Sequence, residues 1–149
     1  MAVGRLRVRI VLDTNVLVAA YLSRSAQSAN LRVLRMWAER RLQLILSEEI
    51  RSEFLAVLAR LGVSSTYLRA LDRRLVTRAT VTTVRPSKKI SLSRDPSDNA
   101  LLAAAVTGKA KFVVTNDADL LQIPPRMLKP FRFRIVTPRE FLRAIQDRE

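Results

Sequence analysis

The chain has 149 residues, 48% of them hydrophobic and 27% charged, and this length and composition predict one globular domain spanning residues 1–149. It contains no cysteine and no histidine, which excludes disulfides, thiol nucleophiles, histidine general bases and zinc sites built from those residues. Its 27 Lys and Arg residues against 13 Asp and Glu give a net charge of +14, which indicates a polyanionic partner.

Strand-like and helix-like segments alternate along the chain. The first strand ends in the apolar run Ile10–Leu12, as expected of a strand buried on both faces. Such alternation predicts βαβ units, and hence an α/β fold with a central parallel sheet and helices on both faces. In the first half of the chain we expect strand Arg7–Leu12, a helix from Asn15, helix Ser28–Arg41, strand Leu42–Leu46 and a helix that is capped by Ser47 and ends before Gly62. Helix Ser65–Arg78, strand Val81–Val84 and a basic loop Arg85–Arg94 follow. The last elements are a helix capped by Asp95 and ending at Gly108, strands Lys111–Thr115 and Phe133–Val136, and a terminal helix opened by the capping box Thr137–Glu140.

The basic residues favour nucleic acid as the partner. Only five of them are lysines, and arginine binds phosphate through two donors and stacks on bases. Genomic base composition or salt-bridged helix faces also produce arginine-rich chains. No apolar run approaches the roughly 20 residues of a membrane span, and no signal-peptide pattern opens the chain. We therefore expect a cytoplasmic protein with no membrane partner.

Acidic residues follow two of the predicted strands. Asp13 comes directly after the first strand, and Asp117 follows strand Lys111–Thr115. Functional groups gather at the carboxyl ends of parallel strands, so these two acids lie close together if their strands are neighbours. Taken singly, an Asp after a strand is more commonly the N-cap of the next helix.

Two further acids lie on helices. Asp98 has apolar residues three, four, seven and eight positions later, which places its carboxylate on the buried stripe near the helix N-terminus. Glu53 falls at the margin of the apolar stripe of its own helix. A buried carboxylate needs a partner, because an unpaired buried charge is unfavourable. An arginine is the ordinary partner, whereas several converging acids indicate a divalent cation.

An acidic cluster in a basic chain suits a metal-dependent phosphodiesterase. Arginines would bind the polyanion while carboxylates hold Mg²⁺ or Mn²⁺, which prefer hard oxygen ligands and do not require histidine. Six of the 13 acids occupy candidate positions: Asp13, Glu53, Asp95, Asp98, Asp117 and Asp119.

Four segments, in this order and spacing, resemble the motifs of PIN domains, and most closely those of the VapC-like toxin branch of toxin–antitoxin systems. The resemblance covers nearly the whole chain, as far as Ile135–Leu142. The segments are Leu12–Leu17, Ser47–Ile50 leading to Glu53, Arg94–Asn99 and Thr115–Leu121.

The resemblance implies a three-layer α/β/α sandwich, a metal-dependent endoribonuclease that uses one or two Mg²⁺ or Mn²⁺ ions to activate water, an antitoxin partner encoded nearby, and a homodimer. It leaves the relative roles of Asp117 and Asp119 open, because Asn116 stands where relatives often have glycine. Carried over residue by residue, the catalytic acids are Asp13, Glu53, Asp98 and Asp117, of which Asp13, Asp98 and Asp117 hold metal; the accessory acids are Asp95 and Asp119, and the polar supports are Thr14, Asn15 and Thr115.

Two other functions remain open. One is an RNA-binding scaffold that is not catalytic, or is active only within a complex. The other is an aspartate-based phosphotransferase, but such sites need a second Asp two residues after the first, where this chain has Asn15. The basic loop Arg85–Arg94 receives no role from the sequence.

Overall fold

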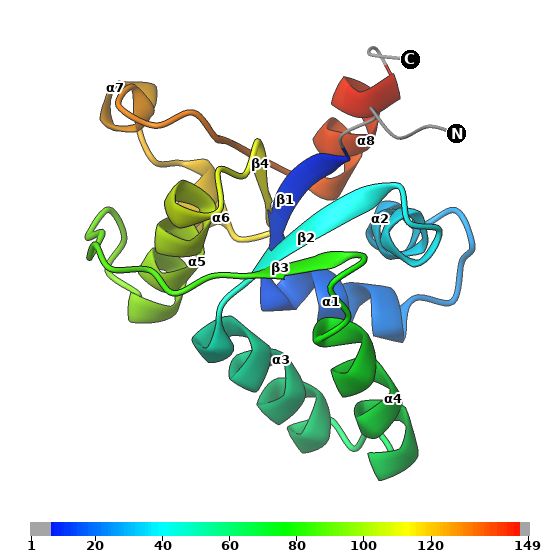
Figure 1. The fold of residues 1–149 in the computed structure, drawn as a ribbon. Coiled ribbons are helices and arrows are strands. Elements are labelled where there is room, and N and C mark those ends of the chain that lie inside the picture. The colour runs from blue at the N-terminus through cyan, green and yellow to red at the C-terminus, as the bar shows by residue number, and fades with distance from the viewer. Residues whose placement is uncertain (1–6, 147–149) are drawn as a thin grey trace.

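The computed structural model describes residues 7–146 as a parallel sheet enclosed by helices (Figure 1). Within the described residues, five strands form one sheet in the order β3-β2-β1-β4-β5, and every neighbouring pair is parallel. The first strand of the chain is therefore central and lies beside β4, with Leu12 paired to Val114. The strands are β1 (Val8–Leu12), β2 (Leu42–Leu46), β3 (Val81–Thr83), β4 (Phe112–Val114) and β5 (Arg134–Val136).

Helices cover both faces of the sheet. α2 and α8 pack together on one face, and α5 covers the opposite face (Figure 1). The predicted three-layer α/β/α sandwich is confirmed. The helices are α1 (Thr14–Leu22), α2 (Ala29–Ala38), α3 (Glu48–Arg60), α4 (Ser65–Leu75), α5 (Pro96–Thr107), α6 (Ala118–Leu121), α7 (Pro125–Leu128) and α8 (Pro138–Gln146).

The centre of the sheet is fully buried. Ile10 and Val11 of β1 and Val113 of β4 have no exposed surface, as the continuous apolar run of β1 predicts. Phe112 packs edge-on against Phe141 of α8, with ring centroids 5.3 Å apart, which fixes α8 against the sheet. Within residues 7–146, none of the helices combines the length and apolar character needed to cross a lipid bilayer.

The predicted helix starts are confirmed by their capping bonds. The Ser47 hydroxyl accepts from the Ile50 N–H, at 3.3 Å, at the start of α3. At α8 the Thr137 N–H donates to the Glu140 carboxylate, at 2.9 Å, and the Glu140 N–H donates to the Thr137 hydroxyl, at 3.1 Å, which completes the capping box. These bonds satisfy backbone donors that a helix start would otherwise leave unpaired.

The helix ends and the shortest elements differ from prediction. α2 ends at Ala38 rather than Arg41, because Arg40 adopts a left-handed backbone with φ 62°. α4 ends at Leu75, three residues before the predicted Arg78. The four-residue helices α6 and α7 were not predicted, since a single turn carries no hydrophobic periodicity.

Candidate metal centre

Three carboxylates from distant parts of the chain meet at the carboxyl end of the central strands. Asp13 directly follows β1, Asp117 follows β4 after two residues, and Asp98 is the third residue of α5. Each offers one carboxylate oxygen, and these oxygens all lie within 4.8 Å of one another. The pairing of β1 with β4 produces this convergence, because it brings the ends of both strands to the same edge of the sheet.

Asp13 occupies the N-cap position of α1, but its side chain makes no capping hydrogen bond. Its Oδ2 instead accepts from the Thr115 hydroxyl, at 2.7 Å, and from the Asn15 side-chain amide, at 3.1 Å. Asp117 does cap a helix, since its Oδ1 accepts from the Asp119 N–H at 2.9 Å. The N-cap interpretation therefore accounts for one oxygen of Asp117 and does not account for the orientation of Asp13.

Thr115 and Asn15 connect the two acids that follow the strands. The fully buried Thr115 hydroxyl donates to Asp13 and accepts from the Asp117 N–H, at 2.9 Å. The Asn15 side-chain oxygen accepts from the Asn116 N–H, at 3.1 Å. Both side chains therefore fix the carboxylates relative to one another, and their role as polar supports of a metal site stays a prediction.

Asp98 is held by the predicted loop Arg85–Arg94, to which the sequence assigned no role. The Ser93 hydroxyl donates to Asp98 Oδ2, at 2.9 Å. Asn99 holds that loop, because its Oδ1 accepts from the N–H groups of Leu92, at 3.1 Å, and Ser93, at 2.9 Å, while its Nδ2 donates to the Ser93 carbonyl, at 2.8 Å. The available signal was the position of Asn99 within the Arg94–Asn99 motif, but the path of the loop follows no periodic pattern.

The remaining candidate acids occupy different places. Glu53 lies on α3 and accepts from the Thr14 hydroxyl, at 2.7 Å. Asp95 caps α5 through the Ser97 N–H, at 2.9 Å. Both line the same cavity as the three carboxylates, whereas Asp119 is exposed and does not line it. Within the described residues, the group of acids whose oxygens lie close enough together to hold one metal ion therefore contains Asp117 and not Asp119.

Burial and mutual repulsion raise the pKa of two of these acids. The pKa of Asp98 is raised to about 6, first by burial and then by the charges of Asp117, Asp95 and Asp13, against the lowering effect of the Ser93 hydroxyl. Burial also raises the pKa of Asp13, although the Thr115 hydroxyl and the Thr14 N–H oppose that rise. A divalent cation would relieve this repulsion, because it favours the ionised carboxylates.

The carboxylates open into a cavity of about 490 Å³ with one apolar side. That side is formed by Val18, Ala19 and Leu22 of α1 and by Val57 of α3. Leu22 is 61% exposed, so this apolar lining extends from the buried acids to the solvent.

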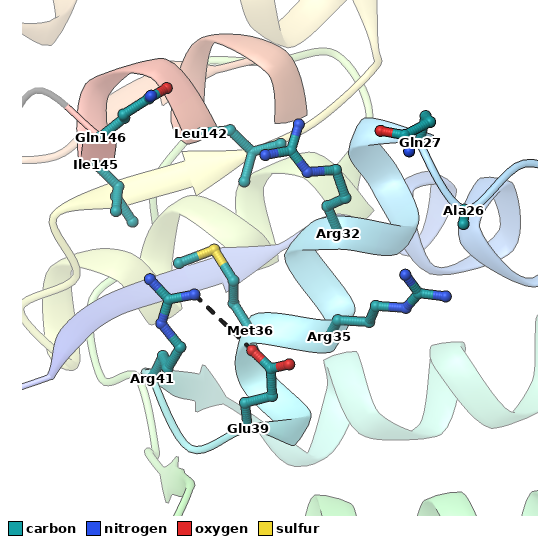
Figure 2. A pocket seen from close by; sticks show the side chains of 10 residues that line it. All are labelled: Ala26, Gln27, Arg32, Arg35, Met36, Glu39, Arg41, Leu142, Ile145 and Gln146. Carbon is teal, nitrogen blue, oxygen red and sulfur yellow. Dashed lines mark ion pairs between the residues drawn. The ribbon is translucent and has the colours of Figure 1, made fainter.

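A second cavity, of about 510 Å³, lies between α2 and α8 and contains none of the predicted site residues (Figure 2). Arg32 and Arg35 project from α2 along its edge, and Arg41 forms an ion pair with Glu39, at 3.8 Å. This cavity carries three arginines and is also lined by the apolar side chains of Met36, Leu142 and Ile145. It offers no set of metal ligands.

A family model of the PIN domain matches residues 9–119. The chain belongs to the PIN domain family. The match includes all nine predicted site residues, from Asp13 to Asp119, and it confirms the family named from the sequence motifs.

This PIN domain also resembles a solved structure, that of VapBC2 from Rickettsia felis bound to a DNA fragment from their promoter. The likeness covers 87% of this chain and 98% of that chain, with a TM-score of 0.55 and 15% sequence identity. At this identity the likeness concerns the fold. No curated protein matches the chain in a sequence search.

Proposed function

We propose that this PIN domain, comprising residues 1–149, is a metal-dependent endoribonuclease that hydrolyses RNA phosphodiester bonds. The supporting observation is the convergence of Asp13, Asp98 and Asp117 without a cationic partner. Within residues 7–146, none of these three acids forms an ion pair with Lys or Arg, although the chain carries a charge of +14. The ordinary structural explanation of buried acids, an arginine partner, therefore does not apply to them.

The donor set fits Mg²⁺ or Mn²⁺. Three carboxylates with no thiol or imidazole nearby are the hard oxygen ligands that these ions prefer, and waters complete such a shell. Asp13, Asp98 and Asp117 would hold one or two ions. When bound, such an ion supplies activated water and neutralises charge on the scissile phosphate.

The chain's own groups would orient the ligands and the substrate. Thr115 and Asn15 hold Asp13, and Ser93 holds Asp98, so the carboxylates are fixed before any ion binds. Glu53, held by Thr14 on the cavity wall, provides a fourth carboxylate facing the substrate. Without histidine in the chain, we assign cleavage to hydrolysis rather than to attack by the ribose 2′-hydroxyl.

We further propose that the domain is the cytoplasmic toxin of a toxin–antitoxin pair, forming a homodimer and binding an antitoxin encoded nearby. Support comes from the sequence motifs and from the fold shared with the VapBC2 structure. Expression of the wild type in a bacterial host should arrest growth, and co-expression of the neighbouring gene should relieve the arrest. Growth unaffected by the wild type would remove the toxin assignment without affecting the nuclease assignment.

The nuclease assignment is tested with end-labelled single-stranded RNA. We expect cleavage in Mn²⁺ or Mg²⁺, none in EDTA, and none with Asp13→Asn or Asp98→Asn, while circular dichroism reports folded variants. Glu39→Gln, which changes an exposed carboxylate that lies outside the cluster and does not line its cavity, is the matched control and should cleave normally. RNA binding without cleavage under every metal condition would instead identify a non-catalytic scaffold.

A further inference from the structure

A third cavity, of about 550 Å³, lies beside the basic loop that follows β3. Its apolar lining comes from Val84, Pro86 and Ile90 on the loop side and from Pro96, Ala100 and Ala103 on α5. We call it the loop cavity. Val84 and Ile90 also pack against the hydrophobic core, which anchors the loop wall.

Unpaired charges surround this apolar lining. Arg85, Lys88 and Lys89 line the cavity and are exposed, and within residues 7–146 none of them forms an ion pair. Two acids at the start of α3 also line the cavity: Glu48, which is paired with Arg51, and Glu49, which is an exposed acceptor. Cations around an apolar pocket complement a ligand that joins an anionic group to a flat apolar one, and a nucleotide has this chemistry.

The loop cavity and the carboxylate cavity lie on either side of the first turn of α5. Asp95, Ser97 and Asp98 line the carboxylate cavity, whereas Pro96 and Asn99 line the loop cavity. A helix with its side chains is about 10–12 Å across. Stacked nucleotides are spaced by about 3.4 Å along a strand, so roughly three to four of them, or fewer in an extended strand, span this turn.

The loop is also fixed to the metal-ligand residues. Asn99 lines the loop cavity and bonds to the backbone of Leu92 and Ser93, and Ser93 donates to Asp98. These bonds tie the end of the loop to the start of α5, which carries both Asp98 and part of the loop cavity's lining. Two cavities connected in this way suit one strand that occupies both.

We propose that the loop cavity binds an unpaired nucleotide of the RNA strand whose scissile phosphate lies at the carboxylate cluster. The base enters the apolar cavity, the backbone phosphates bind Arg85, Lys88 and Lys89, and Glu49 accepts from amino or imino groups of the base. This assignment rests on the proposed ribonuclease function. It makes single-stranded RNA the preferred substrate, because a paired base is not available to enter the cavity.

The test uses two double variants with the same change in charge. Lys88→Ala/Lys89→Ala removes two exposed lysines from the loop cavity, and Lys111→Ala/Lys129→Ala removes two exposed lysines outside it. Binding of labelled single-stranded RNA is measured in EDTA, over a range of salt concentrations. We expect the loop variant to bind about tenfold more weakly and to lower the salt slope by about 1.4, which corresponds to two lost phosphate contacts. The control should change binding less than twofold.

A third variant tests the base rather than the phosphates. Ala100→Leu fills part of the loop cavity without altering charge, so it should weaken binding of single-stranded RNA about tenfold and leave duplex RNA binding unchanged. Circular dichroism melts check that each variant is folded. If Ala100→Leu is unfolded, the two lysine variants still decide whether the loop binds RNA.

The outcomes separate the two proposals. If the wild type cleaves RNA with metal but the loop variant binds as tightly as the control, the loop cavity assignment is wrong and the nuclease assignment stands. If the loop variant loses single-stranded and duplex RNA equally and a folded Ala100→Leu loses neither, the loop is a general basic surface and no base enters the cavity. If the wild type does not bind RNA but binds labelled poly-glutamate, and that binding is lost in the Lys88→Ala/Lys89→Ala variant, the loop cavity binds an acidic protein segment and both proposals are overturned.

Discussion

Replacing Asp98 with Asn should stabilise the metal-free protein at neutral pH. Asp98 has a pKa raised from 3.8 to about 6 in the folded chain, so its ionisation favours the unfolded state. Its contribution to stability is present below pH 4 and is lost as pH rises through 6. A shift of about two pKa units, at 1.36 kcal/mol each, corresponds to about 3 kcal/mol at pH 7.

Asn removes this charge and keeps the shape of the side chain. Its side-chain oxygen can still accept the Ser93 hydroxyl, which bonds Asp98 in the wild type. For a chain of this length, 1 kcal/mol shifts the melting temperature by about 2–4 °C, so the variant should melt about 6–12 °C higher in EDTA at pH 7. Thermal melts at pH 4.5 and pH 7, with and without millimolar Mn²⁺, are the assay.

Both the pH and the metal dependence must hold. The gap between variant and wild type should shrink at pH 4.5, and Mn²⁺ should stabilise the wild type much more than the variant, because ligand binding stabilises only the state that binds. Glu49→Gln, an exposed carboxylate outside the cluster, should shift stability by less than about 0.5 kcal/mol. A less stable Asp98→Asn, with no metal-dependent shift in the wild type, would make Asp98 a purely structural residue and refute the reasoning.

Three other changes have defined outcomes. Thr115→Val removes the hydroxyl that orients Asp13 and should weaken Mn²⁺ binding about 10- to 100-fold by titration calorimetry; unchanged affinity would contradict the supporting role. Wild-type Mn²⁺ affinity should fall as pH drops below 6, because protons compete with the ion for Asp98. An affinity that stays constant in calorimetry between pH 5 and pH 7.5 would contradict this. Gly108→Ala places a Cβ against the buried Ile45 Cγ2, closer than van der Waals contact allows, and should destabilise the fold by about 1–3 kcal/mol. An unchanged melting curve would overturn this prediction.

The sequence predicts the longer elements because their signals are local. The apolar run Ile10–Leu12 indicates a buried strand, and Ser47 and the Thr137–Glu140 box mark helix starts through bonds that span only three residues. The strand order is not local. The pairing of β1 with β4 depends on packing of the whole sheet, so the sequence could bring the acids after these strands together only on the condition that the strands are neighbours.

In the candidate site, too, the sequence predicts what local signals determine and misses what tertiary contacts determine. Helical spacing was enough to place Asp98 on a buried face, and strand ends were enough to select Asp13 and Asp117. Ser93 and Asn99 escaped prediction because their contacts depend on the path of an irregular loop. The position of a carboxylate is therefore readable from periodicity, whereas the groups that orient it depend on tertiary contacts.

The contact between Asp13 and Thr115 has a consequence for synthesis of the chain. These two residues are 102 positions apart, and Asp117 lies still further along. β1 emerges from the ribosome first, but its neighbour β4 is made only after β2 and β3. A nascent or truncated chain that stops before Asp117 cannot hold the three carboxylates together, even with its first three strands paired. The cluster can assemble only when about four-fifths of the 149-residue chain has been synthesised, so products that stop before Asp117 lack it.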